Sequence, residues 1–350
     1  MYTPHFTITN SILRDIGLIE AAREVITSAP LLPYYEKKFR DDAMVRAVHY
    51  GTHIEGNELS LVQAEKVMSG QIVAARDRDI QEVLNYRKVM ETIGQLNQEG
   101  KPVVLDEQFI KLLHTITVEK ILPSEQCGVY RTSQVVIRNS HNGEVVFTPP
   151  VAAHVTEQMQ DFVAFLQQTN SNEMHPVLKS GIVHYEFVRI HPFADGNGRV
   201  ARALSTLILF LEGYDIRQFF SLEEYFDKDA LSYYTALQSV SQQGEDLTKW
   251  LEYFSHGLAY ELGKIRERVE HVSVDSRLKQ KLGGKPLLLS DRQLRIIEYI
   301  QETGFLQNQA FRELFPMISE DAVLLDLKTL VKSGLIKKSG VTKGAKYVMS

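Results

Sequence analysis

Hydrophobic residues recur at a spacing of three and four along most of this chain, which is the period of amphipathic helices. Such stripes run through Ile12 to Ile19 and through Val83 to Ile93. A different pattern appears once, where the β-branched runs Val135-Val136-Ile137 and Val145-Val146-Phe147 flank Asn142-Gly143 and predict a hairpin. The fold is therefore expected to be mainly α. The predicted helices lie within residues 8–70, 76–98, 107–116, 152–166, 175–190, 200–212 and 261–277.

The pattern changes after Gly283-Gly284-Lys285-Pro286, which predicts a linker. Three helical stretches within residues 290–332 and a strand pair ending at Met349 follow, an order typical of a winged helix, so a small C-terminal α+β domain is expected. Winged helices often bind DNA, but Glu320 and Asp321 begin the third helix, and carboxylates oppose phosphate binding. DNA therefore remains a partner that is not favoured, and a protein contact or a homodimer is preferred.

Composition narrows the class of protein. The 350 residues are 44% hydrophobic and 24% charged, which is ordinary for a soluble globular chain long enough for two or three domains. The net charge of −5 does not support a globally basic nucleic-acid binder, and the single cysteine excludes an internal disulfide. The sequence has no apolar run near the roughly 20 residues that span a membrane, and it does not begin with a secretory pattern. We therefore expect a cytoplasmic protein without membrane contact.

The candidate chemistry gathers between two predicted helices, in the stretch from His191 to Arg202. Gly196, Asn197 and Gly198 let the backbone approach a ligand, and the following helix offers free N–H groups to a polyphosphate. Arg199 and Arg202 can donate to further phosphate oxygens. Asp195 is a hard oxygen ligand suited to Mg²⁺. His191 is the side chain here that can take a proton near neutral pH.

This stretch resembles the signature of Fic-domain proteins, H-x-F-x-[D/E]-G-N-G-R-x-x-R, at every specified position. The resemblance implies a Fic-type helical core with a β-hairpin flap, and a nucleotidyltransferase that usually moves AMP from ATP to a protein hydroxyl with Mg²⁺. His191 would then be the base, and Asp195 the metal ligand. The nucleotide would be bound by Gly196, Asn197, Gly198, Arg199 and Arg202.

Three other stretches resemble parts of the same family. Glu55-Gly56-Asn57 is similar to the core of the inhibitory motif [S/T]-x-x-x-E-[G/N], whose glutamate withdraws the second arginine, here Arg202, from the γ-phosphate; Gly51 stands at the Ser/Thr position. The hairpin resembles the flap that pairs with the target segment as an added strand, through Val135, Val136, Ile137, Val145, Val146 and Phe147. Tyr233 and Tyr234 resemble the Y-Y-x-A-L stretch that borders the nucleotide pocket.

The expected organisation follows. Residues 1–104 would be a helical region carrying the inhibitory segment, and 105–262 the Fic core. Residues 263–287 would be a helix and linker, and 288–350 the winged helix.

The resemblance implies a protein adenylyltransferase that binds ATP and a target protein bearing a Ser, Thr or Tyr hydroxyl, with self-modification left open. Two alternatives remain. The site could remove AMP, alone or in addition to adding it, with Glu55 orienting a water. The protein could instead be a DNA-binding regulator whose site senses a nucleotide. A metallohydrolase is disfavoured, because one His and one Asp in the loop fall short of a usual protein ligand set.

Overall fold

The computed structural model describes residues 2–31, 33–96, 103–138, 145–168, 174–214, 218–273, 289–316, 318–340 and 345–350. The chain divides into two compact units. One unit comprises Met1–Glu24 and Arg40–Ile265, and the other comprises Val25–Phe39 and Arg266–Ser350. Among the described residues, no helix is both long and apolar enough to cross a membrane.

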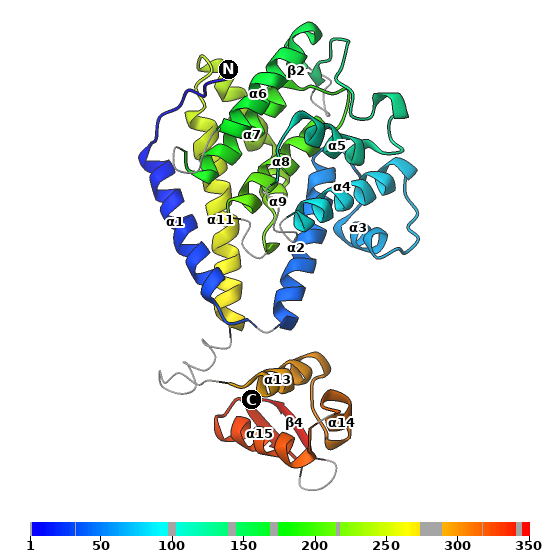
Figure 1. Cartoon of the computed structure of the whole chain (residues 1–350), viewed down its shortest axis with the longest axis vertical. Helices are drawn as coiled ribbons and strands as arrows, with labels where there is room; N and C mark the ends of the chain where they lie inside the picture. The colour runs from blue at the N-terminus through cyan, green and yellow to red at the C-terminus, as the bar shows by residue number, and fades with distance from the viewer. Residues whose placement is uncertain are drawn as a thin grey trace. The chain divides into compact units, whose positions relative to one another are not determined.

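The first unit is built almost entirely from helices (Figure 1). Three of them, α1, α2 and α11, also extend into the residues of the second unit. In chain order the helices are α1 (Asn10–Ser28), α2 (Pro33–His53), α3 (Leu61–Met68), α4 (Asp77–Gln95), α5 (Glu107–Val118), α6 (Val155–Gln168), α7 (Pro176–Ile190), α8 (Asn197–Leu211), α9 (Leu222–Lys228), α10 (Ala230–Gln242) and α11 (Thr248–Val272).

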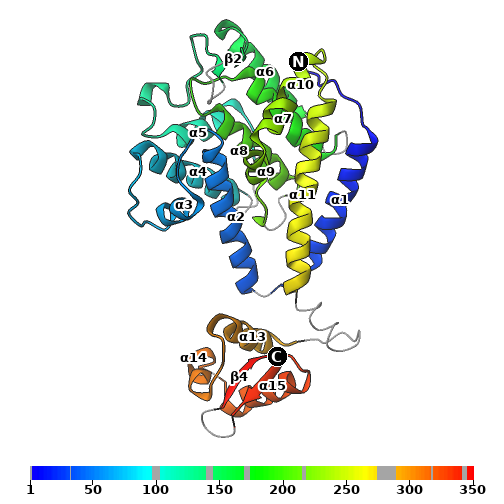
Figure 2. The same ribbon diagram turned by 180° about the vertical axis from the view of Figure 1, so that it is seen from behind.

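Helices α7 and α8 form the centre of this unit. They lie side by side in both views (Figures 1 and 2), and α4 and α5 pack against α8. Almost every residue of α7 is buried, and α8 buries Val200, Leu204 and Leu207. The loop between α7 and α8 is therefore held by two core helices, which fixes the position of the residues it carries.

Local signals in the sequence explain several helix ends. Ser60 and Gln63 form the predicted capping box at the start of α3, so this prediction is confirmed. The predicted start of the long helix near Glu261 is wrong, because α11 begins at Thr248. Its first turns bury Trp250 and Phe254 in the core, a tertiary contact that its charged second half does not reveal.

The predicted hairpin is present but shorter than expected. Strand β1 (Ile137–Arg138) pairs antiparallel with β2 (Val145–Phe147), and the register shifts between Ile137 and Arg138. Val135 and Val136 lie outside the strand because Pro149 and Pro150, which follow β2, have no N–H to continue the ladder. The predicted turn around Asn142-Gly143 lies outside the described residues.

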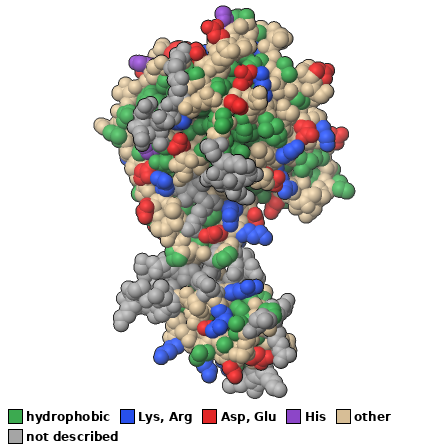
Figure 3. Space-filling model, in the orientation of Figure 1, with side chains coloured by type: hydrophobic (Ala, Val, Ile, Leu, Met, Phe, Trp, Pro, Cys, Tyr) green, Lys and Arg blue, Asp and Glu red, His purple; other side chains and the backbone are tan. Residues whose placement is uncertain are grey.

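The second unit has the elements expected at the C-terminus, in the expected order. They are α13 (Asp291–Thr303), α14 (Phe311–Leu314), α15 (Glu320–Lys332) and the antiparallel strands β3 (Ile336–Ser339) and β4 (Lys346–Met349). Ile300, Leu327 and Tyr347 belong to its core. Basic and acidic side chains both appear on the face of this unit seen in Figure 3. Its assignment as a winged helix stays a prediction, and the predicted linker at 283–286 lies outside the described residues.

Candidate active site

The loop between α7 and α8 is shaped by its own side chains. His191 ends α7 in a left-handed conformation (φ 49°, ψ 60°), which turns the chain out of the helix. The buried side chain of Asn197 then closes the loop, because its Oδ1 accepts from the Phe193 N–H and its Nδ2 donates to the Phe193 carbonyl, both at 2.9 Å. The Asn197 side chain therefore holds the loop, and only its backbone is left for a ligand at the start of α8.

Glycines keep the first turn of α8 open. Gly196 caps the helix with φ 79°, and a Cβ there would come within 2.9 Å of Val118 Cγ1. A Cβ on Gly198 would collide with the carboxylate of Glu55. A negatively charged group of the chain itself thus lies against the helix N-terminus, where free N–H groups and the helix dipole favour an anion.

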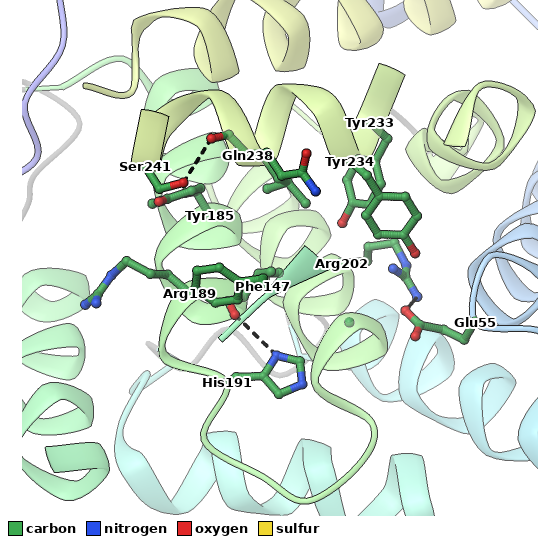
Figure 4. Close-up of a pocket in the computed structure, with 13 residues that line it drawn as sticks. Glu55, Phe147, Tyr185, Arg189, His191, Arg202, Tyr233, Tyr234, Gln238 and Ser241 are labelled. Carbon is green, nitrogen blue, oxygen red and sulfur yellow. Dashed lines mark hydrogen bonds and ion pairs between the residues drawn. The ribbon is translucent and has the colours of Figure 1, made fainter. Parts of the chain in front are cut away.

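Glu55 and Arg202 form an ion pair at this point, in which the arginine is buried (Figure 4). Arg202 Nη2 donates to Glu55 Oε1 at 2.7 Å and to the Gly51 carbonyl at 2.8 Å. Burial opposes the charge of Arg202, but Glu55, together with Tyr233 and Tyr86, outweighs this effect and raises the pKa of the guanidinium. The last turn of α2 and the turn that follows it therefore each supply one acceptor of this arginine.

The glycine at the Ser/Thr position of the motif has a structural reason. A Cβ on Gly51 would collide with the ring of Tyr86, whose hydroxyl donates to Glu223 Oε1 at 3.1 Å. The neighbouring hydroxyl of Thr52 donates within its own helix, to the Val48 carbonyl at 3.0 Å. Neither position therefore supplies a side-chain hydroxyl to the Glu55 turn, and Gly51 contributes its carbonyl instead.

Asp195 is held on both oxygens. Its Oδ1 accepts from the Gly196 N–H at 2.5 Å and from Arg199 Nη2 at 3.3 Å, and its Oδ2 accepts from Arg78 Nη2 at 2.7 Å. Burial would raise the pKa of this carboxyl, but Arg199, the Gly196 N–H and Arg78 together lower it. Arg199 also lies 3.4 Å from Glu82 Oε1 on α4. Asp195 is therefore a carboxylate in an arginine-rich setting.

Two residues that the sequence analysis did not single out support the loop. His114 stacks on Phe193 with ring centroids 3.7 Å apart; its Nδ1 accepts from the Gly128 N–H, so its Nε2 carries the proton and donates to the Asp195 carbonyl at 3.0 Å. Burial lowers the pKa of His114 to about 4, which keeps this neutral form. Arg131 Nε donates to the His191 carbonyl at 2.8 Å. The available signal for His114 was a polar residue on the buried face of α5.

His191 lines a pocket of about 750 Å³, counting its open mouth, together with Glu55, Phe147, Arg202 and Tyr234 (Figure 4). Its Nδ1 lies 3.3 Å from the Val188 carbonyl. This contact favours a proton on Nδ1 and leaves the lone pair on Nε2. Burial lowers the pKa of His191 to about 4, against the smaller opposing effects of the Val188 carbonyl and Glu55. The imidazole is therefore neutral near pH 7 and able to accept a proton.

The two tyrosines lie differently. Tyr233 is buried, and its hydroxyl lies 2.8 Å from Nε2 of the fully buried His184. Burial raises the pKa of Tyr233 to about 12. Tyr234 is partly exposed at the mouth, and its hydroxyl contacts the Ile54 carbonyl in the turn that carries Glu55. Both rings line the pocket, Tyr233 from the buried aromatic core and Tyr234 with part of its side chain exposed.

Phe147, at the end of β2, is the hairpin residue that lines the pocket among the described residues (Figure 4). Val135 and Val136 precede the strand, so they do not belong to the β-ladder that was expected to include them. The side chains of Ile137, Val145 and Val146 lie outside the described residues.

A magnesium site would depend on Asp195. No group of three or more His, Cys, Asp or Glu side chains among the described residues is arranged to hold a metal. Mg²⁺ in nucleotide sites commonly takes one or two carboxylates together with phosphate oxygens and water. The side chain of Asp195 is 33% exposed, so its Oδ2 can fit this role once Arg78 moves.

Part of this chain is similar in sequence to known proteins. Residues 104–209 match the model of the Fic/DOC family. "Protein adenylyltransferase fic-1" of Caenorhabditis briggsae is 32% identical over 171 residues, which cover 48% of this chain and 32% of the relative. "Protein adenylyltransferase Fic" of Culex quinquefasciatus is 26% identical over 201 residues, covering 56% of this chain and 38% of the relative. This chain thus spans only about a third of the length of these curated relatives.

Solved structures show the same fold. A Fic family protein from Desulfovibrio desulfuricans matches with a TM-score of 0.71 and 23% identity, covering all of this chain and 98% of the other. A Fic domain containing signaling protein from Bacteroides thetaiotaomicron matches with a TM-score of 0.60 and 23% identity, covering 76% of this chain and all of the other. Together with the family match, they identify residues 104–209 as a Fic domain within a mainly helical fold shared with Fic proteins.

Proposed function

We propose that this protein transfers AMP from ATP to a Ser, Thr or Tyr hydroxyl of a target protein. The observation that carries the proposal is one pocket in which a neutral His191 lies beside the glycine-containing first turn of α8 and beside Arg202. The names of the sequence relatives, protein adenylyltransferases, support the same reaction class.

In the proposed reaction the triphosphate lies on the backbone N–H groups of the Gly196–Gly198 turn, and Arg199 and Arg202 donate to its oxygens. The hydroxyl oxygen of the target bonds to the α-phosphorus while His191 Nε2 takes its proton. The bond from the α-phosphorus to the bridging oxygen breaks, and pyrophosphate leaves with that electron pair. Mg²⁺ held by Asp195 would neutralise phosphate charge. The Val188 carbonyl keeps the imidazole oriented by accepting from Nδ1.

The Glu55–Arg202 pair supports an autoinhibited resting state. The Glu55 carboxylate lies where an atom added to Gly198 would stand, so it occupies the space that a phosphate needs at the start of α8. It also holds the guanidinium of Arg202, which a γ-phosphate would otherwise engage. We infer that Glu55 must leave this position before ATP binds productively.

Removal of AMP is a second candidate activity. The side chain of Glu55 is 32% exposed and lines the same pocket as His191, so it could orient a water molecule toward a bound AMP-protein. This activity requires Glu55, whereas the proposed transfer is restrained by it. Glu55 variants therefore separate the two activities.

The test uses ATP labelled on the α-phosphate, with Mg²⁺, the full chain and a cell lysate. Glu55→Gly should label itself or a lysate protein. Adding His191→Ala should reduce labelling by roughly 10²- to 10⁴-fold, the usual contribution of a general base. His154→Ala, at an exposed histidine outside the pocket, is the matched control. Full labelling without His191, or none by Glu55→Gly, would refute the proposal. Release of AMP from labelled protein by wild type but not by Glu55→Gly would favour the second activity.

A further inference from the structure

Arg78 makes a contact that the proposed reaction does not use. It lies in the first turn of α4, and its Nη2 donates to Asp195 Oδ2 at 2.7 Å. The other oxygen of Asp195 is taken by the Gly196 N–H and by Arg199. Among the described residues, Arg78 is the hydrogen-bond donor to Oδ2, the oxygen through which Asp195 would ligate a metal.

Arg78 is anchored at one end and has space at the other. Its Nε donates to Glu82 Oε1 at 3.1 Å, and Glu82 is itself fixed by the side-chain amide of Asn57 at 3.0 Å. The Arg78 side chain is 59% exposed, and it borders an open cavity of about 540 Å³ that Glu55 also lines. The guanidinium can therefore leave Asp195 while Glu82 keeps it beside the loop.

We propose that Arg78 is a positioning residue that occupies Oδ2 of Asp195 in the nucleotide-free protein and releases it when a metal-bound polyphosphate arrives. A bare divalent cation at Asp195 would displace Arg78 and leave two cations facing each other. A polyphosphate gives the displaced guanidinium anionic oxygens to bind, so the exchange no longer loses a partner. This inference rests on the proposed function, because it needs a polyphosphate beside Asp195.

The consequence is a coupling between metal and nucleotide. Arg78 weakens the binding of a free cation at Asp195 and strengthens the binding of a cation that carries phosphates. A side chain that merely stabilises the fold would change both affinities in the same direction or leave both unchanged.

The first measurement is binding of Mn²⁺ without nucleotide, followed by electron paramagnetic resonance of the free ion. Arg78→Gln should bind Mn²⁺ roughly two- to fivefold more tightly than wild type, which corresponds to the loss of one exposed ion pair. Arg76→Gln is the matched control. Arg76 precedes α4 and carries the same charge, but it pairs with Asp79 and Glu58 instead of Asp195. The gain should disappear in Arg78→Gln/Asp195→Asn.

The second measurement is binding of ATP in the presence of Mn²⁺, in the Glu55→Gly background. Here Arg78→Gln should weaken nucleotide binding severalfold, whereas it should strengthen the binding of free Mn²⁺. Arg78→Lys should retain part of the wild-type affinity for nucleotide. Equal Mn²⁺ affinities for Arg78→Gln and Arg76→Gln, or no Mn²⁺ binding by any variant, would overturn the inference. AMP transfer by Glu55→Gly is read separately, so transfer without an effect of Arg78 on the metal would refute this inference alone.

Discussion

Two carboxylate–arginine pairs flank the loop at the start of α8, and they differ in the burial of their arginines. Glu55–Arg202 and Asp195–Arg78 have the same N–O distance of 2.7 Å. The side chain of Arg202 is 1% exposed, whereas that of Arg78 is 59% exposed. Removing one partner of a buried pair leaves an uncompensated charge and costs about 3–5 kcal/mol, but an exposed pair contributes about 0–1 kcal/mol.

The difference indicates that burial, rather than distance, sets what each pair can do. Arg202 cannot turn to water when Glu55 leaves, so it must receive another anion, and a phosphate at Gly198 is the one the geometry offers. Arg78 can turn to water at little cost, so its contact with Asp195 is easily exchanged. On this reasoning Glu55–Arg202 is an inhibitory pair in which a nucleotide phosphate must replace Glu55. In the second pair, Arg78 is an exchangeable partner of Asp195.

The largest effect should come from breaking the buried pair. Glu55→Gly should lower the free energy of unfolding by about 3 kcal/mol, the low end of the range for a buried pair, because Glu55 itself is one-third exposed. It should also raise AMP transfer roughly tenfold or more, since about 1.4 kcal/mol of released inhibition gives that factor. Urea unfolding with and without ATP measures the first effect, and ATP should restore stability by occupying the site.

The control for this prediction is Glu58→Gly. Glu58 is an exposed glutamate whose recorded ion pair is with Arg76, so its removal should cost less than about 1 kcal/mol. Equal stability losses for the two glycine variants would contradict the contrast between the buried and the exposed pair.

The sequence predicts the loop and its candidate chemistry because the residues involved lie close together along the chain. The stretch from His191 to Arg202 is twelve residues long, and the spacing of its polar side chains predicts a base, a metal ligand and an anion site. Asn197 was expected to bind nucleotide, but its side chain is used to close the loop. A spacing pattern cannot distinguish a polar side chain that contacts a ligand from one that shapes the backbone.

The supporting residues could not be predicted in the same way. Arg78, His114 and Arg131 contact the loop from 117, 81 and 60 positions away in the chain. Their local sequence shows only an exposed helix start, a polar residue on an apolar face, and a residue after a turn. Their roles depend on the packing of α4 and α5 against α8, which no local period encodes.

A smaller effect is expected from the glycine beneath the buried pair. In Gly51→Ser the new side chain would meet the ring of Tyr86, and such overpacking typically costs about 1–3 kcal/mol. The Gly51 carbonyl also accepts from Arg202, so displacing the backbone at Gly51 should weaken the Glu55–Arg202 contact. AMP transfer should therefore rise, but less than in Glu55→Gly. Gly17→Ser in α1 is the control, since nothing lies within 4 Å of a Cβ there. Replacing a helical glycine with serine should stabilise the protein by about 0.5 kcal/mol. An unchanged melting temperature for Gly51→Ser would mean that Tyr86 moves aside freely.

The smallest effect, and the most direct reading of the two carboxylates, concerns the protonation of His191. Its pKa of about 4 lies below the ordinary value near 6.5, so at about pH 5.5 the imidazole should remain largely neutral and able to act as a base. Both carboxylates raise this pKa because they favour the imidazolium, and Glu55 has a larger effect than Asp195. Removing either negative charge disfavours the imidazolium, so the pKa should fall further in Glu55→Gln and by less in Asp195→Asn. Nuclear magnetic resonance of the His191 ring during an acid titration measures both shifts without requiring activity. A larger fall of the His191 pKa in Asp195→Asn, or a rise of this pKa in either variant, would show that Glu55 is not the carboxylate with the larger effect on His191.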